Sequence, residues 1–250
     1  MSTPVVTPAG VRAALAHLAG VQKTNKGAPA YSRLVNRPMG RLFAAVAFVL
    51  GRTPNQVTMV SASFTFGAIA LIALVPPTLW AAIITCAMLV LGYALDAADG
   101  QLARLRGGGS VAGEWLDHVV DAVKIATLHL AVLISWYRFH DGDDGVHHLQ
   151  LLIPLGYQVV SSVLFFVIIL NDQLRRAHRG TTDMLLAGAG SSSTLYSLAV
   201  VPTDYGLLCV VFALRSWEHG FLWSYSALLA ANAAFVVLAL VKWYREMRTY

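Results

Sequence analysis

The chain has 250 residues, of which 57% are hydrophobic and only 12% are charged. A mean hydropathy of +0.62 is too high for a domain whose surface faces water, so the composition indicates an integral membrane protein. The net charge of +5, taken alone, would fit a nucleic-acid partner or an anionic membrane surface, and the hydropathy decides for the membrane.

The N-terminal part of the chain falls into two segments. Residues 1–30 lack the apolar core of a signal peptide and contain Pro, Gly, Thr and Lys, so we expect a flexible cytoplasmic tail. In residues 31–52, Arg33, Arg37 and Arg41 recur every four residues, with apolar side chains largely around the other side. This pattern predicts an amphipathic helix lying in the membrane interface.

The remaining residues, 53–250, are predicted to form an all-α membrane domain of six helices. Most of the apolar runs are long enough for one crossing of a hydrocarbon core of roughly 30 Å, and the fifth is short. Pro76-Pro77, the glycines at 107–109 and the polar loop 138–147 separate the first four runs. The predicted spans are residues 55–75, 78–104, 113–137, 148–170, 202–217 and 221–242.

The basic residues predict the orientation of these spans. In this arrangement 15 of the 18 Lys and Arg residues lie on one side, two on the other, and Lys124 inside a span. The positive-inside rule then places both termini in the cytoplasm, together with the loop between the second and third spans.

Four aspartates lie in the ends of the second and third predicted spans that meet at this loop. Asp96 and Asp99 are three residues apart, and Asp117 and Asp121 are four apart, so each pair shares a helical face. A carboxylate inside a span costs roughly 2.5–3.5 kcal/mol on insertion scales, which marks such residues as functional. Facing carboxylates repel one another unless cations lie between them, and oxygen ligands favour Mg²⁺, Mn²⁺ or Ca²⁺ over zinc.

Small residues flank the acidic pairs. Gly100, Ala103 and Gly113 would leave room for a phosphate or nucleotide beside the ions. The segment 96–121 matches every fixed position of D-x2-D-G-x2-A-R-x8-G-x3-D-x3-D, and in this it resembles the CDP-alcohol phosphotransferase family. The run from Pro54 to Thr58 is similar to a Pro-Asn-x-x-Thr segment of the same family.

The resemblance implies an enzyme of phospholipid biosynthesis that transfers a phosphatidyl or other phospho-alcohol group from a CDP-linked donor to an alcohol acceptor, with release of CMP. It implies two divalent ions, Mg²⁺ or Mn²⁺, one held by Asp96, Asp99 and Asp117 and the second sharing carboxylates with Asp121, the catalytic base. The implied nucleotide-binding residues are Gly100, Ala103, Arg104, Gly113, Asn55 and Thr58. Membrane lipids are expected partners, a homodimer is one expectation for the assembly, and nucleic acid is not expected.

The motif does not determine the acceptor site. Arg175, Arg176 and Arg179, with Lys124, are candidates to bind an acceptor phosphate, although such arginines also follow from the positive-inside rule alone. His118 is a further candidate, because the run Gly-Glu-x-x-Asp-His that ends there is similar to choline and ethanolamine phosphotransferases. That similarity favours a soluble CDP-aminoalcohol donor with diacylglycerol as the acceptor.

A transporter and a scaffold are the competing classes of membrane protein. A transporter would also hold intramembrane carboxylates, but it would not need the glycine and alanine positions beside them. A scaffold would avoid the aspartates. For an enzyme with a lipid substrate, we expect the helix over residues 31–50 to border a lateral lipid entrance, and removal of residues 1–28 to be tolerated.

Overall fold

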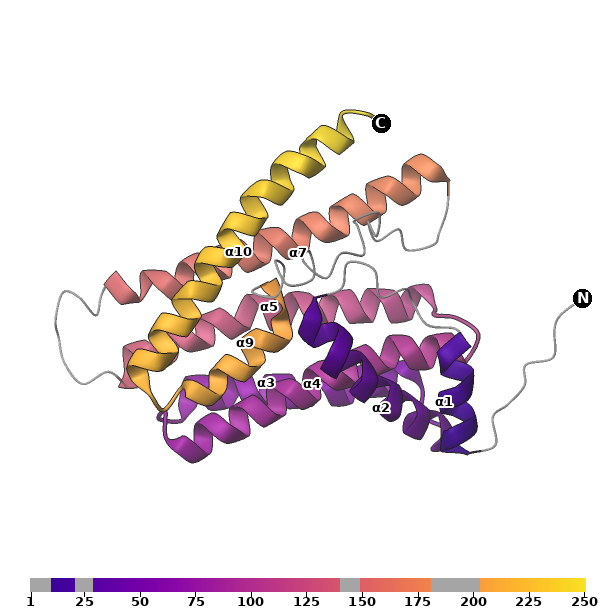
Figure 1. The fold of residues 1–250 in the computed structure, drawn as a ribbon, viewed down its shortest axis with the longest axis horizontal. Coiled ribbons are helices and arrows are strands. Elements are labelled where there is room, and N and C mark those ends of the chain that lie inside the picture. The colour runs from indigo at the N-terminus through magenta and orange to yellow at the C-terminus, as the bar shows by residue number, and fades with distance from the viewer. Residues whose placement is uncertain (1–9, 21–28, 140–148, 181–202) are drawn as a thin grey trace, which may run out of the picture.

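The computed structural model describes residues 10–20, 29–139, 149–180 and 203–250, and every regular element within these ranges is helical (Figure 1). The elements are α1 (Val11–Gly20), the π-helical turn η1 (Ser32–Asn36), α2 (Arg37–Val49), α3 (Pro54–Leu74), α4 (Leu79–Leu105), α5 (Val111–Phe139), α7 (Leu152–Arg179), α9 (Tyr205–Val211), the 3₁₀ turn η3 (Phe212–Leu214) and α10 (Glu218–Met247).

Five of these helices, α3, α4, α5, α7 and α10, are long and apolar enough to cross a membrane. They correspond to the first, second, third, fourth and sixth predicted spans, and they make the chain a multi-pass integral membrane protein. The fourth helix continues to Arg179, well past the predicted end at 170. The reason is packing, because Asn171, Asp172 and Arg175 are buried against neighbouring helices and their side chains do not end the helix.

The fifth predicted span is only partly represented among the described residues. From Tyr205 to Leu214 the chain is helical and apolar, and at 1.5 Å per residue this covers about 15 Å, half of a hydrocarbon core. The predicted start at Pro202 lies outside the described residues. Asp204 caps α9, with one carboxylate oxygen accepting the Gly206 N–H at 3.0 Å.

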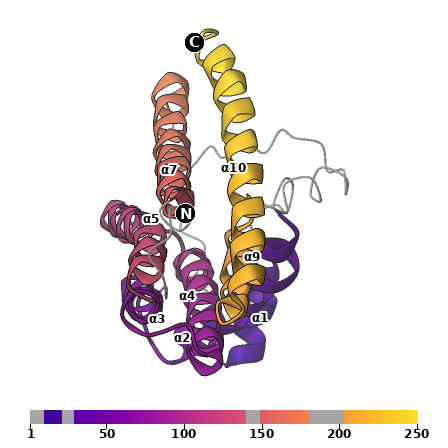
Figure 2. The same ribbon diagram turned by 90° about the vertical axis from the view of Figure 1, so that its left-hand side faces the viewer.

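The long helices form two groups (Figures 1 and 2). Helix α3 packs on α4 and α5, while α7 and α10 pack on each other and stand apart from that layer, with α7 also contacting α5. The core between them is apolar and aromatic, and it centres on Phe212, Phe221 and Tyr225 together with Ile72 and Leu89. Burial of these large side chains holds the two groups together.

The prediction of a flexible tail over residues 1–30 is wrong for residues 11–20, which form α1. Ala14 and Leu18 are fully buried against Ala44 and Leu102, in a second cluster shared with α2 and α4. The segment therefore carries an apolar stripe at i and i+4, a signal that its neighbouring Pro and Gly residues obscure. The other residues of the predicted tail, apart from Gly10 and residues 29 and 30, lie outside the described ones.

The predicted amphipathic helix corresponds to η1 and α2. Its buried face consists of Asn36, Gly40, Ala44, Ala45 and Ala47, small side chains of which the alanines pack in the cluster shared with α4. Leu34, Val35, Leu42, Val46 and Val49 are exposed on the outside. The π-helical turn shifts the register by its extra residue per turn, so Arg33 is exposed while Arg37 and Arg41 are half-buried.

The start of this segment is tied to the start of α9. The Ser32 N–H donates to the second carboxylate oxygen of Asp204 at 2.8 Å. Gly206 lies against the Tyr31 ring so closely that a Cβ at this position would fall 1.9 Å from a ring carbon, and only glycine permits the approach. Burial raises the pKa of Tyr31 above its ordinary value, so this aromatic group stays neutral.

Candidate active site

Three of the four predicted aspartates converge between α4 and α5. Oxygen atoms of Asp96, Asp117 and Asp121 lie within 4.8 Å of one another. The connection between the two helices makes this possible, because Gly107 and Gly108 take φ values of 94° and 134°, which side-chain-bearing residues rarely adopt. The helices therefore reverse direction within a few residues and bring their acidic faces together.

Asp99 stands slightly apart from these three. Its carboxylate accepts a 2.6 Å hydrogen bond from Thr58 on α3, and the residue is 7% exposed. Thr58 was predicted to bind nucleotide, and in the structure its hydroxyl orients an aspartate of the site. The Pro54 carbonyl lies 3.2 Å from the same hydroxyl, which fixes Thr58 at the first turns of α3.

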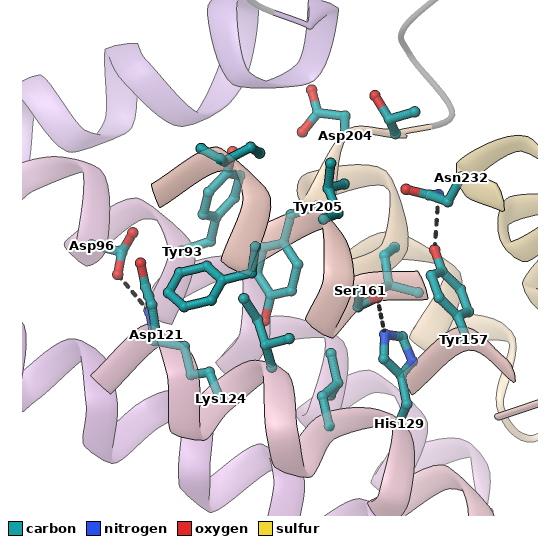
Figure 3. Close-up of a pocket in the computed structure, with 17 residues that line it drawn as sticks. Tyr93, Asp96, Asp121, Lys124, His129, Tyr157, Ser161, Asp204, Tyr205 and Asn232 are labelled. Atoms are coloured by element: carbon teal, nitrogen blue, oxygen red, sulfur yellow. Dashed lines mark hydrogen bonds and ion pairs between the residues drawn. The ribbon is translucent and has the colours of Figure 1, made fainter. Parts of the chain in front are cut away.

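Lys124, predicted to bind an acceptor phosphate, lies among the carboxylates. Its Nζ is 2.5 Å from Asp96 Oδ1 and 2.7 Å from Asp121 Oδ1, and the side chain is buried (Figure 3). An ammonium group in this position offsets part of the repulsion between α4 and α5.

The residues predicted to bind nucleotide lie on α3, α4 and α5, the helices that also carry the aspartates and Thr58. A Cβ added to Gly100 would meet nothing closer than Arg104 Nη1 at 3.7 Å, so that side of α4 has room. Gly113 is tighter, with Asn55 Oδ1 and Ser110 Oγ each 3.2 Å from the position of a Cβ. The buried Nε of Arg104 has no hydrogen-bond partner within the described part of the chain, which suits a residue that meets an anion. Ala103 is half-buried on the same helix.

The other acceptor candidates are distributed along α5 and α7. Arg175 makes two 2.8 Å hydrogen bonds to Glu246 on α10, and Arg176 bonds Glu114 at 2.8 Å and Asp172 at 2.7 Å. His118 lies 3.7 Å from Glu114. Two of the three arginines are thus engaged within the protein, a pairing that sequence spacing alone does not reveal. Arg179 lies at the last turn of α7 and is exposed.

A cavity of about 270 Å³ extends from the carboxylates into the helix bundle (Figure 3). Asp96, Asp121 and Lys124 line one end, and apolar side chains of α5, α7 and α9 line much of the rest, among them Leu128 and Phe165. The cavity was not predictable from the sequence, because its walls come from helices far apart in the chain.

The inner part of the cavity also contains a polar group that was not predicted. His129 lies between Tyr225, at 2.6 Å from Nδ1, and Ser161, at 3.0 Å from Nε2, and it stacks on Tyr157. The amide of Asn232 donates to the Tyr157 hydroxyl at 3.1 Å. In the sequence, a histidine within an apolar stretch was the signal for this polar group. Its partners were not predictable, because they depend on the packing of three helices.

Residues 52–243 match the family model of CDP-alcohol phosphatidyltransferases, and the chain belongs to this family. The fold and the acidic site thus define a membrane transferase of phospholipid biosynthesis. Among curated proteins, it is similar to a phosphatidylinositol phosphate synthase of Corynebacterium glutamicum, with 34% identity over 113 residues. The match covers 44% of this chain and 49% of that relative, so it spans about half the length of the relative.

Proposed function

We propose that the protein transfers a phosphatidyl group from a CDP-linked lipid to an alcohol, with release of CMP. The observation that carries this proposal is the position of Asp96, Asp117 and Asp121, whose oxygens converge within 4.8 Å beside a cavity with apolar walls. The carboxylates suit a diphosphate with bound cations, and the apolar walls suit an acyl-bearing substrate. Family membership favours this transferase over a transporter.

The donor set fits a divalent cation. Carboxylate oxygens are the ligands that Mg²⁺ and Mn²⁺ prefer, and Asp96 and Asp117, which converge in the structure, would hold such an ion with Asp99, as the family motif implies. When bound, it supplies charge neutralisation on the diphosphate.

In the proposed reaction the acceptor oxygen attacks the β-phosphorus of the donor, the bond between that phosphorus and the CMP oxygen breaks, and Asp121 takes the hydroxyl proton. Asp121 is half-buried and borders the cavity, where an alcohol reaches it. Arg104, whose Nε has no partner within the described residues, supports the negative charge of the nucleotide near Gly100.

For the membrane arrangement we propose six spans with both termini and the site in the cytoplasm. In Figure 1, α7 ends at the right of the bundle and α10 begins at the left, and the positive-inside assignment of the two ends calls for one further crossing between them. Helix α9 and η3 supply the last part of that crossing. The excess of basic residues on one side supports the cytoplasmic orientation.

The deciding experiment measures CMP release by the purified full chain. One reaction supplies CDP-diacylglycerol with Mg²⁺ or Mn²⁺ and a series of acceptors, beginning with inositol phosphate because of the name of the relative. A parallel reaction supplies CDP-choline or CDP-ethanolamine with diacylglycerol, the donor and acceptor that the Gly113–His118 run favours. CMP release in the first reaction alone is expected. CMP release in the second alone would overturn the choice of donor.

A further inference from the structure

Lys124 is one of four lysines in the chain, and it is buried at the metal-binding face of α5. A lysine inside a membrane helix costs roughly 2.5–3.5 kcal/mol on insertion scales unless it is paired. Here it is paired twice, with Asp96 on the neighbouring helix and with Asp121 one turn earlier on its own helix. The ammonium therefore bridges α4 and α5 at the cytoplasmic end proposed above.

This bridge engages two of the carboxylates that a second ion would need. The family resemblance puts a second divalent ion between carboxylates shared with Asp121, and Mg²⁺ binds oxygen at about 2.0–2.1 Å. The Lys124 Nζ already lies 2.5 Å and 2.7 Å from oxygens of Asp96 and Asp121. An ammonium and a divalent ion cannot share that position, because their volumes overlap and their charges repel.

We propose that the Lys124 ammonium replaces the second divalent cation, so that the site binds one ion per chain. This inference rests on the proposed function. Asp99 and Asp117, the two carboxylates that Lys124 does not pair with, would remain to hold the single ion. Lys124 is a positioning residue here, because it holds the carboxylates of Asp96 and Asp121 at a fixed separation and supplies one positive charge beside the base.

The test counts Mn²⁺ ions bound to the full chain in detergent, using the electron paramagnetic resonance signal of free Mn²⁺ during titration. We expect one ion per wild-type chain. In Lys124→Met, which keeps an unbranched side chain one atom shorter and removes its charge, we expect two ions, with the line broadening of two neighbouring Mn²⁺ ions. Lys242→Met is the matched control, because Lys242 is exposed on α10, and it should bind one ion.

Two ions in the wild-type chain would overturn the proposal, and this result does not depend on the folding of any variant. A single ion in a Lys124→Met protein that elutes as the wild type does would overturn it as well. Failure of the proposed function has a different signature, because Mn²⁺ would still bind at one per chain while CMP release from every CDP-linked donor was absent.

Discussion

Asp117 faces its acidic neighbours across the site, and its oxygen lies within 4.8 Å of those of Asp96 and Asp121. We expect Asp117→Asn to remove nearly all CMP release while the protein still inserts, because an amide does not replace a charged metal ligand. Excess EDTA should have the same effect on the wild type. Glu218→Gln, an exposed change at the start of α10, is the control. Full turnover in EDTA would disprove the metal requirement.

Thr58 offers a separate test of how Asp99 is held. Thr58→Val keeps the shape but removes the hydroxyl that donates to Asp99 at 2.6 Å, so Mn²⁺ affinity should fall about 10–100-fold. Thr58→Ser retains the hydroxyl and should bind Mn²⁺ nearly as the wild type does. Equal Mn²⁺ affinities in the two variants would show that the Thr58 hydroxyl does not support metal binding. Thr58 would then again be a candidate to bind the nucleotide.

At the level of residues, the fixed spacing of the acidic motif made the convergence of Asp96, Asp117 and Asp121 predictable, since each pair of aspartates shares a helical face whatever the tertiary structure. Partners on other helices were not predictable. Lys124 lies three residues after Asp121, which the sequence reveals, but its contact with Asp96 depends on how closely α4 and α5 approach. The ion pair between Arg175 and Glu246 joins residues 71 positions apart.

Helix α1 changes the expectation for N-terminal truncation. Removal of residues 1–28 should now destabilise the protein, because Leu18 fully buries its side chain against α2 and α4. Leu18→Ala alone should cost about 2–5 kcal/mol of unfolding free energy. Thermal unfolding in detergent measures this, with the exposed His17→Ala as control and removal of residues 1–9 as the tolerated truncation. Unchanged stability without α1 would show that its packing contributes nothing.

The ion pair between Arg175 on α7 and Glu246 on α10 gives a second prediction about how the helices pack. Arg175→Ala removes the two hydrogen bonds that Glu246 accepts from Arg175, so we expect a loss of roughly 1.5–3 kcal/mol in stability. The acceptor KM should stay unchanged, whereas Arg179→Ala tests the arginine that remains a candidate for the acceptor phosphate. A raised acceptor KM in Arg175→Ala, at normal stability, would restore Arg175 as a ligand of the acceptor.

Among the elements, the long apolar helices were predictable from hydropathy and from their Pro and Gly boundaries, as at Thr53, where a capping box with Gln56 starts α3. Short elements were harder. Ten residues of α1 do not stand out between Pro- and Gly-containing neighbours, and the π-helical turn η1 has no sequence signature that separates it from an α-helix. Tertiary packing, more than local preference, determines both.

For the molecule as a whole, the six-span arrangement predicts which loops share a side. The two native cysteines are first removed by Cys86→Ala and Cys209→Ala. In this background Arg106→Cys and Thr249→Cys, introduced one at a time, should react with an impermeant maleimide from the cytoplasmic side. Thr78→Cys, at the turn before α4, should react from the opposite side. Labelling is compared in vesicles that expose the cytoplasmic face of the protein and in vesicles that expose the opposite face. Labelling of positions 106 and 249 from different sides would mean that the chain around α9 does not cross.

The contact between Ser32 and Asp204 joins residues 172 positions apart, and it bears on the order in which the protein assembles during synthesis. Helices α4 and α5 are neighbours in the chain, so the acidic cluster can form as soon as residue 124 has left the ribosome. The wall containing Asp204 and Tyr205 closes only after most of the polypeptide has been made. A nascent chain therefore acquires its carboxylates early, and the cavity beside them is complete only when synthesis is nearly finished.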